Sequence, residues 1–196
     1  MIIYRKELLN LIYISFIIHS CNGQSRNNDN CEINFKKARE LAYVDSVRQS
    51  ALDSALYLAN KCMQCSSIKK SVVDFKISLL VSMKKYEEGI DFIDSLKESD
   101  FTYGYKQNLL SKGLKALEYS DKKDTINRNK MYREISGDLE QYIRNKSIGE
   151  NEFKEIYTDL FSIKENYLDS NQINSEVEAL KNKYPDKKSF FDFFKK

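Results

Sequence analysis

The sequence predicts an all-α protein, and three observations support this prediction. Apolar residues recur at intervals of three and four along most of the chain, which is the spacing of one buried face of a helix. Alternation with a period of two, which a half-buried strand requires, is nowhere sustained. The chain has only 6 Gly and 1 Pro in 196 residues, too few for the many turns of a β-sandwich or barrel. We therefore expect an antiparallel helix-turn-helix array of seven or eight helices.

The expected helices follow one another with short polar breaks. Stripes of apolar residues cover 47–62, 86–96, 110–117, 135–143 and 153–168. The breaks fall at 65–67, 97–100, 120–124, 145–149 and 169–171. Connections of roughly three to eight residues are typical of packed antiparallel helices.

Two signals delimit the last long helix. Ser175 and Glu178 have the spacing of a capping box, in which each side chain binds a backbone N–H at the start of a helix. Pro185 is expected to end this helix at about Tyr184, because a proline disfavours helical backbone in the residue before it.

The tail is rich in phenylalanine, with four Phe in the five residues 190–194. On a helix, Phe190, Phe193 and Phe194 would share one face. We expect this face to dock on the preceding helix and cap the array. An exposed aromatic segment that contacts a partner or the bilayer is the alternative.

Residues 1–20 have the features of a secretory signal peptide. Arg5 and Lys6 give a positive start, and residues 8–18 form an apolar core broken only by Asn10 and Ser15. This core is too short to cross a bilayer, which needs about 20 residues. We therefore expect residues 1–20 to be removed on export.

The end of this segment, Ile18-His19-Ser20-Cys21, resembles the lipobox of bacterial lipoproteins, although His19 is unusual at its position. The resemblance implies that Cys21 receives a diacylglycerol, becomes the mature N-terminus and is acylated further, with palmitate among the chains. Two or three chains hold a protein on a membrane where one does not, since each buried CH₂ contributes about 0.8 kcal/mol. A plain secretory signal with an incidental Cys21 is the alternative.

Residues 21–32 are expected to be a lipidated flexible tether, and residues 33–196 the helical domain. The stretch 22–30 is too polar to pack a core. Asn22 stands where the best-known lipoprotein sorting rule has Asp for retention in the inner membrane. The resemblance therefore implies a cell-envelope protein anchored in the outer membrane, and the lack of an acidic run after the cysteine favours the side that faces the periplasm.

Three cysteines remain after cleavage: Cys31, Cys62 and Cys65. Thiols can oxidise outside the inner membrane. We favour a disulfide from Cys31 to Cys62 or Cys65 over a local Cys62–Cys65 bridge. Residues i and i+3 of a continuous helix have Cβ atoms about 5–6 Å apart, whereas a disulfide prefers about 3.8 Å. Simple packing of free thiols stays open, and a redox-active pair is disfavoured because no strand precedes it.

The predicted mature chain offers no constellation for catalysis. The single His, His19, lies in the signal peptide, which excludes a Ser-His-Asp triad, a Cys-His pair and a metal site with His ligands. Three thiolates lack a fourth zinc ligand, and no phosphate-binding Gly-rich loop occurs. We expect no enzyme activity, no metal and no cofactor. The net charge of +3 on an exported chain does not indicate nucleic acid as a partner.

Some helical segments recur at an interval of 34 residues. The segment 55–58 precedes 89–92 by this interval, and Leu80 precedes Leu114. A 34-residue helix-turn-helix period is that of the tetratricopeptide repeat. The unit that begins at Leu79 is similar to this family.

Three residues of this unit match the family's pattern, namely Tyr86, Gly89 and Ile90, at the loop into the second helix. The chain departs from the pattern at Ser82 and Met83, which replace Leu-Gly, and it lacks Trp. The resemblance covers about residues 35–119. It implies an α-solenoid that binds protein, and a non-repetitive helical bundle is the alternative.

These features predict a lipid-anchored envelope protein that acts as a protein-interaction adaptor or scaffold. The membrane contact is expected through the lipid, and the partner is expected to be a protein. The alternative is a lipoprotein that binds a small ligand or handles a substrate, with paired carboxylates as a weak catalyst. A deep pocket with two acids of opposed pKa shifts would favour this alternative, and a broad open groove would favour the adaptor.

Overall fold

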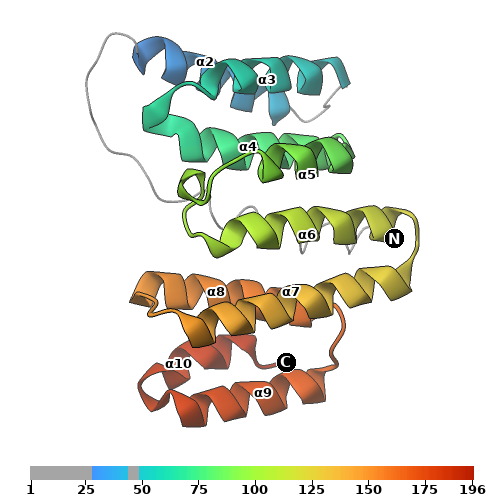
Figure 1. Cartoon of the computed structure of the whole chain (residues 1–196), viewed down its shortest axis with the longest axis vertical. Coiled ribbons are helices and arrows are strands. Elements are labelled where there is room, and N and C mark those ends of the chain that lie inside the picture. The colour runs from blue at the N-terminus through green and yellow to red at the C-terminus, as the bar shows by residue number, and fades with distance from the viewer. Residues whose placement is uncertain (1–27, 44–48) are drawn as a thin grey trace. The chain divides into compact units, whose positions relative to one another are not determined.

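The computed structural model describes residues 28–43 and 49–196, drawn in colour in Figure 1. All regular elements in these ranges are helical, which confirms the predicted all-α class. They include nine α-helices, α2 to α10, of which α10 is a single turn. The chain divides into two compact units, one up to Leu114 and one from Lys115, and each is described by itself.

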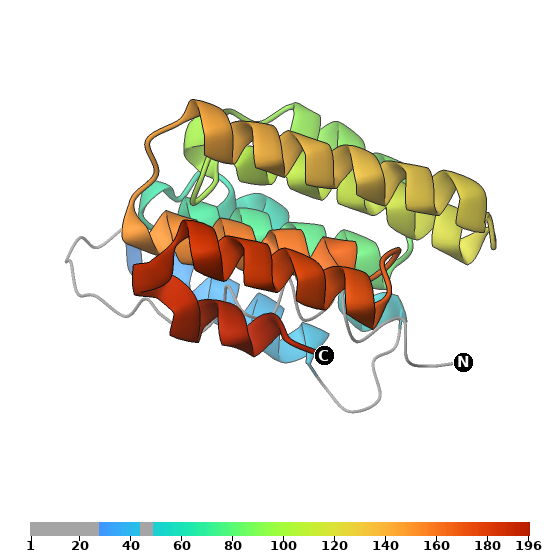
Figure 2. The same cartoon turned by 90° about the horizontal axis from the view of Figure 1, so that it is seen from below.

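The first unit is built from helix pairs. It contains α2 (Asn28–Ala42), α3 (Gln49–Cys62), α4 (Lys69–Ser82), α5 (Tyr86–Asp94) and the first part of α6 (Tyr105–Asp121). Helix α2 packs along α3, α3 along α4, and α4 along α5 (Figures 1 and 2). A turn of three residues makes α4 and α5 antiparallel neighbours.

Helix α4 lies at the centre of this unit and is buried on two sides. Phe75 and Leu79 pack in one apolar cluster with α2 and α3. Val73 and Ile77 pack in a second cluster with Ile93 of α5 and α6 residues. A helix between two layers needs apolar side chains on both faces, which explains why α4 has no single apolar stripe.

Helix α2 begins five residues before the expected start of the domain. Residues 28–32, which we assigned to the tether, are helical. The apolar stripe of α2 in fact extends back to Cys31, which lies one turn before the buried Phe35 and packs on the same cluster. Cys21, the predicted signal peptide and Val47 lie outside the described residues.

The turn after α4 is a Schellman motif. Lys85 N–H donates to the Leu80 carbonyl at 2.9 Å, and Lys84 N–H donates to the Val81 carbonyl at 3.0 Å. Lys84 has φ of 58°, a left-handed conformation that normally favours glycine. The helix therefore ends cleanly although the sequence has no glycine there.

The second unit contains the end of α6, α7 (Thr125–Asn145), α8 (Glu150–Lys164), α9 (Ser170–Lys183) and α10 (Lys188–Phe191). Helix α7 packs against α8, and the final turns lie along α9, as the red ribbons of Figure 2 show.

The capping box that we assigned to Ser175 and Glu178 is wrong, because Ser175 lies within α9. The box is formed earlier, where the Asp169 carboxylate accepts from Gln172 N–H at 2.9 Å and the Gln172 side chain accepts from Asp169 N–H at 3.0 Å. The end of α9, with Tyr184 as its C-cap, agrees with the prediction from the following proline.

One buried lysine links three helices of this unit. Lys164 of α8 has a side chain only 8% exposed, and its Nζ donates to Glu140 Oε1 of α7 at 2.6 Å and to Glu176 Oε2 of α9. Burial alone would lower the pKa of Lys164, but the hydrogen bonds to the two carboxylates outweigh burial and raise it. The ammonium group therefore stays charged inside the unit.

The phenylalanine tail docks within the second unit as expected, with Phe190 and Phe194 partly buried, but Phe191 takes the place that we expected for Phe193. Phe191 is fully buried and Phe194 stacks on Phe161 with ring centroids 4.5 Å apart, whereas Phe193 is 84% exposed. The chain tightens into a 3₁₀ turn over Asp192–Phe194. A 3₁₀ turn places residues i and i+3 on one side, so Phe191 and Phe194 share the buried face.

Candidate functional site

A cleft of about 1090 Å³ runs between α2 and the start of α4. We call it the α2–α4 groove. Its walls are α2 on one side and, on the other, the 3₁₀ turn Ser66–Ile68 with the first turns of α4. It is lined by Glu32, Phe35, Lys36, Arg39, Glu40, Tyr43, Ser66, Ser67, Ile68, Lys70, Ser71, Asp74 and Thr102.

Aromatic side chains give the groove an apolar part. Phe35 is buried, and its ring meets Phe75 edge-on with centroids 5.5 Å apart. Tyr43, at the end of α2, is 48% exposed and contacts the same Phe75 ring at 6.3 Å. Phe75 of the central helix α4 thus contacts both groove rings.

The rest of the groove is charged, with both signs represented. Its cations are Lys36, Arg39 and Lys70, and its carboxylates are Glu32, Glu40 and Asp74. Lys36 and Glu40 form an ion pair at 4.0 Å, which is exposed and contributes little to stability.

Two polar contacts join elements of the first unit that are remote in the sequence. Lys69 Nζ, at the start of α4, donates to Asp100 Oδ1 at 2.6 Å. This hydrogen bond holds the pKa of Asp100 below its usual range. Gln107 of α6 donates to the carbonyls of Ile93 and Leu96 at 3.1 and 3.0 Å, which satisfies the end of α5.

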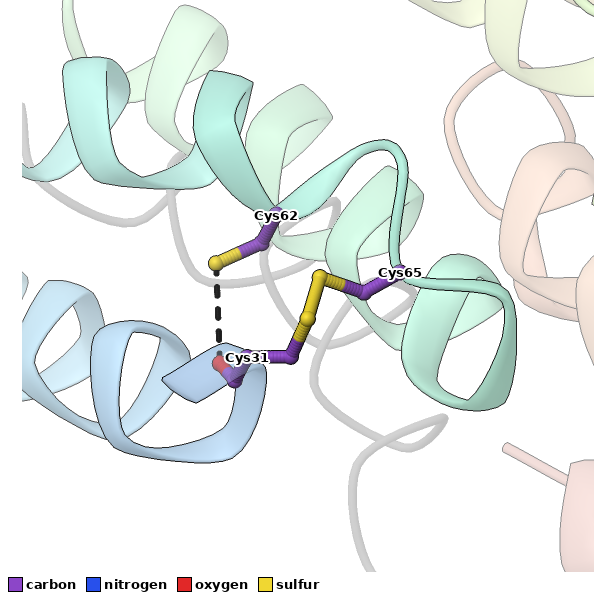
Figure 3. The surroundings of a disulfide bond; sticks show 3 residues. All are labelled: Cys31, Cys62 and Cys65. Carbon is purple, nitrogen blue, oxygen red and sulfur yellow. Dashed lines mark hydrogen bonds between the residues drawn. A yellow bond between two sulfur atoms is a disulfide. The ribbon is translucent and has the colours of Figure 1, made fainter. Parts of the chain in front are cut away.

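The three predicted cysteines lie together (Figure 3). The structure joins Cys31 of α2 to Cys65, the residue before the 3₁₀ turn, by a disulfide across 34 residues. Cys62, the last residue of α3, keeps a free thiol that is buried. Of the pairings left open by the sequence, the structure therefore contains the one between Cys31 and Cys65.

The environment of Cys62 does not activate its thiol. Its Sγ donates to the Cys31 carbonyl oxygen at 3.6 Å, and burial raises its pKa. A nucleophilic cysteine needs a lowered pKa, because the thiolate is the reactive species. The geometry of Cys62 is therefore that of a packed core residue.

The repeat-motif residues lie on α4 and α5, away from the α2–α4 groove. Leu79 is buried, and Tyr86 and Ile90 are half-buried on α5. Gly89 lies where α5 comes closest to α6, so that a Cβ atom added there would stand 2.4 Å from Leu114 Cδ2. The absence of a side chain at Gly89 therefore leaves room for the Leu114 side chain.

The carboxyl groups with shifted pKa values show one direction of shift. In the described part of the chain, those of Asp100, Glu118, Asp124, Glu150, Glu178 and Asp192 lie below their ordinary values. Hydrogen bonds from nearby lysines are the main cause, except at Asp124, which accepts from Asn127 at the start of α7. Within residues 28–43 and 49–196, no group of three or more His, Cys, Asp or Glu side chains could hold a metal ion.

Comparison of the chain with protein-family models, with curated proteins and with solved structures finds no match. The helices among the described residues include none that is long and apolar enough to span a membrane.

Sequence reasoning missed the α2–α4 groove and the polar contacts of the first unit. The groove depends on how α2 is placed against α4, and no periodic signal encodes this. The partners Lys69 and Asp100 are 31 residues apart, and both look like ordinary surface charges in the sequence. The CxxC spacing of Cys62 and Cys65 did draw attention to the right end of α3.

Proposed function

We propose that this chain is a lipid-anchored protein of the cell envelope whose helical body binds a partner protein in the α2–α4 groove. In this proposal Cys21 is acylated after removal of residues 1–20, and the body faces the periplasm from the outer membrane. The protein acts as an adaptor or scaffold and not as an enzyme.

The character of the groove carries this proposal. It is a half-open cleft with two aromatic rings, Phe35 and Tyr43, and with charges of both signs along its walls. Pockets for small ligands enclose most of the surface of the ligand. An open cleft with an aromatic floor and a polar rim is closer to the anatomy of a protein interface.

The groove also has the position expected for a repeat protein. We propose that α2 to α6 form a degenerate tetratricopeptide-like solenoid, in which the first helix of each pair lines the binding surface. Helices α4 and α6 begin 36 residues apart, near the family's period of 34. The close approach at Gly89 fits the small residue that the repeat pattern has there.

Site-specific photo-cross-linking in intact cells tests the binding surface. A photoreactive residue at Ser71 in the groove should capture one protein species, whereas the same residue at the exposed Glu87 of α5 should not. Arg39→Glu should reduce the captured species, since it reverses a charge on the groove wall. Equal capture from both positions, or capture insensitive to Arg39→Glu, would contradict the proposal.

Mass spectrometry of the native protein tests the anchor independently. The mature N-terminus should be Cys21 carrying acyl chains, and Cys21→Ser should block processing or release the protein from membranes. An unmodified N-terminus, or one at another residue, would rule out lipidation without bearing on the groove.

A further inference from the structure

A second surface, on α2 and α3, has properties that the proposed adaptor function does not use. A cleft of about 560 Å³ follows the seam between these helices. We call it the α2–α3 seam. It is lined by Lys37, Leu41, Asp53, Ser54, Tyr57 and Leu58, and no residue of α4 takes part.

The seam presents apolar side chains to solvent. Tyr57 is 59% exposed, and Leu41 and Leu58 are only partly buried by the core beneath them. Ile33, one turn before Lys37 on α2, is 62% exposed. Apolar side chains that gather on one exposed face indicate that something covers it.

The charges of the α2–α3 seam indicate what binds over it. Lys37 stands on the α2 side and Asp53 on the α3 side, and Leu41, Tyr57 and Leu58 line the same cleft. Neither makes an ion pair within the described part of the chain; Asp53 only accepts a hydrogen bond from the Gln49 side chain at 3.3 Å. The seam thus carries one charge of each sign without an ion pair, one on each of its two helices.

This arrangement is complementary to itself. If two copies meet face to face about a two-fold axis along the seam, α2 of one copy lies over α3 of the other. Lys37 of each copy then faces Asp53 of the other, and the apolar side chains of the two seams meet. We infer that the α2–α3 seam is a contact between two copies of this chain.

The contact should be weak. Helix α3 has 14 residues and is therefore about 21 Å long, and two helices side by side are about 20 Å wide. The face measures about 400 Å², half of the roughly 800 Å² per partner in a standard interface. Copies confined to one membrane surface would meet far more often than copies in solution, so the contact suits an anchored protein.

Cross-linking between two tagged forms of the full-length chain tests this inference. A photoreactive phenylalanine derivative in place of Tyr57 should give a covalent dimer that carries both tags. Charge reversal then tests the pairing. Lys37→Asp alone and Asp53→Lys alone should each reduce the dimer at least about tenfold, because like charges then face each other twice.

The decisive experiment is to cross-link a mixture of the two variants. A copy with Lys37→Asp and a copy with Asp53→Lys have opposite charges at both contacts, so their mixed dimer should return to within about twofold of the wild-type yield. The mixed arm contains the same two chains, and it therefore controls for their folding. Lys36→Asp, which reverses a neighbouring charge outside the seam, should leave the dimer unchanged.

Three results would overturn the inference: no dimer from Tyr57, a dimer indifferent to the charge reversals, or a mixed pair no better than either variant alone. None of these would affect the proposed function, because the seam and the α2–α4 groove share no lining residue.

Discussion

The Cys31–Cys65 disulfide should contribute more to the stability of the first unit than any other single contact. The bond closes a loop of 34 residues between the start of α2 and the end of α3. In the chain-entropy model, a loop of this length lowers the entropy of the unfolded chain enough to stabilise the fold by about 3.8 kcal/mol. Cys65→Ser should therefore lower the free energy of unfolding of this unit by about 3–4 kcal/mol, and Cys31→Ser should do the same.

The assay must distinguish the first unit from the second. Hydrogen exchange followed by mass spectrometry, at increasing urea concentration, reports the opening of α2 and α3 separately from that of α7 to α9. Addition of a reductant to the wild type should reproduce the effect of Cys65→Ser, and the reductant should have no further effect on that variant. At each urea concentration, the exchange of α8 peptides should be the same with and without reductant and in the wild type and the variant.

Cys62→Ser is the matched control, since this thiol is buried beside the bond but does not form it. It should cost about 1 kcal/mol, for the lost packing of the sulfur atom, and the variant should stay as sensitive to reductant as the wild type. If Cys62→Ser instead removes the sensitivity to reductant, the pairing is wrong. If reduction lowers the free energy of unfolding of the first unit by less than about 1 kcal/mol, the chain-entropy argument for this loop is wrong.

Three further predictions concern packing and charge. Gly89→Ala should destabilise the first unit by about 1–2 kcal/mol, because the added methyl overpacks against a buried leucine. Gly137→Ala, with no atom within 4 Å of its new Cβ, should instead stabilise the second unit by about 0.5–1 kcal/mol in urea unfolding. Phe191→Ala should cost about 3–5 kcal/mol and Phe193→Ala less than about 0.5 kcal/mol, since one ring is fully buried and the other exposed; similar melting temperatures would contradict the tail packing. The lowered pKa of Asp100 stabilises the fold above the ordinary carboxyl pKa of about 3.9 and ceases to do so as the pH falls through its folded value. Asp100→Asn should therefore make the stability of the first unit fall less between neutral and strongly acidic pH, and an acid titration as steep as that of the wild type would show that the Lys69 contact is absent.

The periodicity of apolar residues predicted the helical class because each helix buries at least one face. It predicted less about helix ends. Lys84 adopts the left-handed conformation at the end of α4, a position that glycine usually occupies. Ser175 and Glu178 had the right spacing for a cap, but Asp169 and Gln172 have the same spacing six residues earlier and form the box because α9 starts there.

Local rules also misjudged the tail, for a reason of helix geometry. An α-helix turns by about 100° per residue and would place Phe190, Phe193 and Phe194 on one side. The 3₁₀ turn over Asp192–Phe194 advances by about 120° and turns Phe193 outward instead. A sequence pattern cannot distinguish these two turns, since the packing of Phe191 against the second unit decides between them.

The candidate site was beyond reach of the sequence because its two walls are remote in the chain. The disulfide nevertheless explains why they meet. Cys31 directly precedes Glu32, the first groove residue of α2, and Cys65 directly precedes Ser66, the first groove residue of the opposite wall. The bond therefore ties the two walls to each other at one end of the α2–α4 groove. The sequence pattern of the cysteines indicated only a disulfide. In the structure this bond also determines where α2 stands relative to α4 and gives the groove its form.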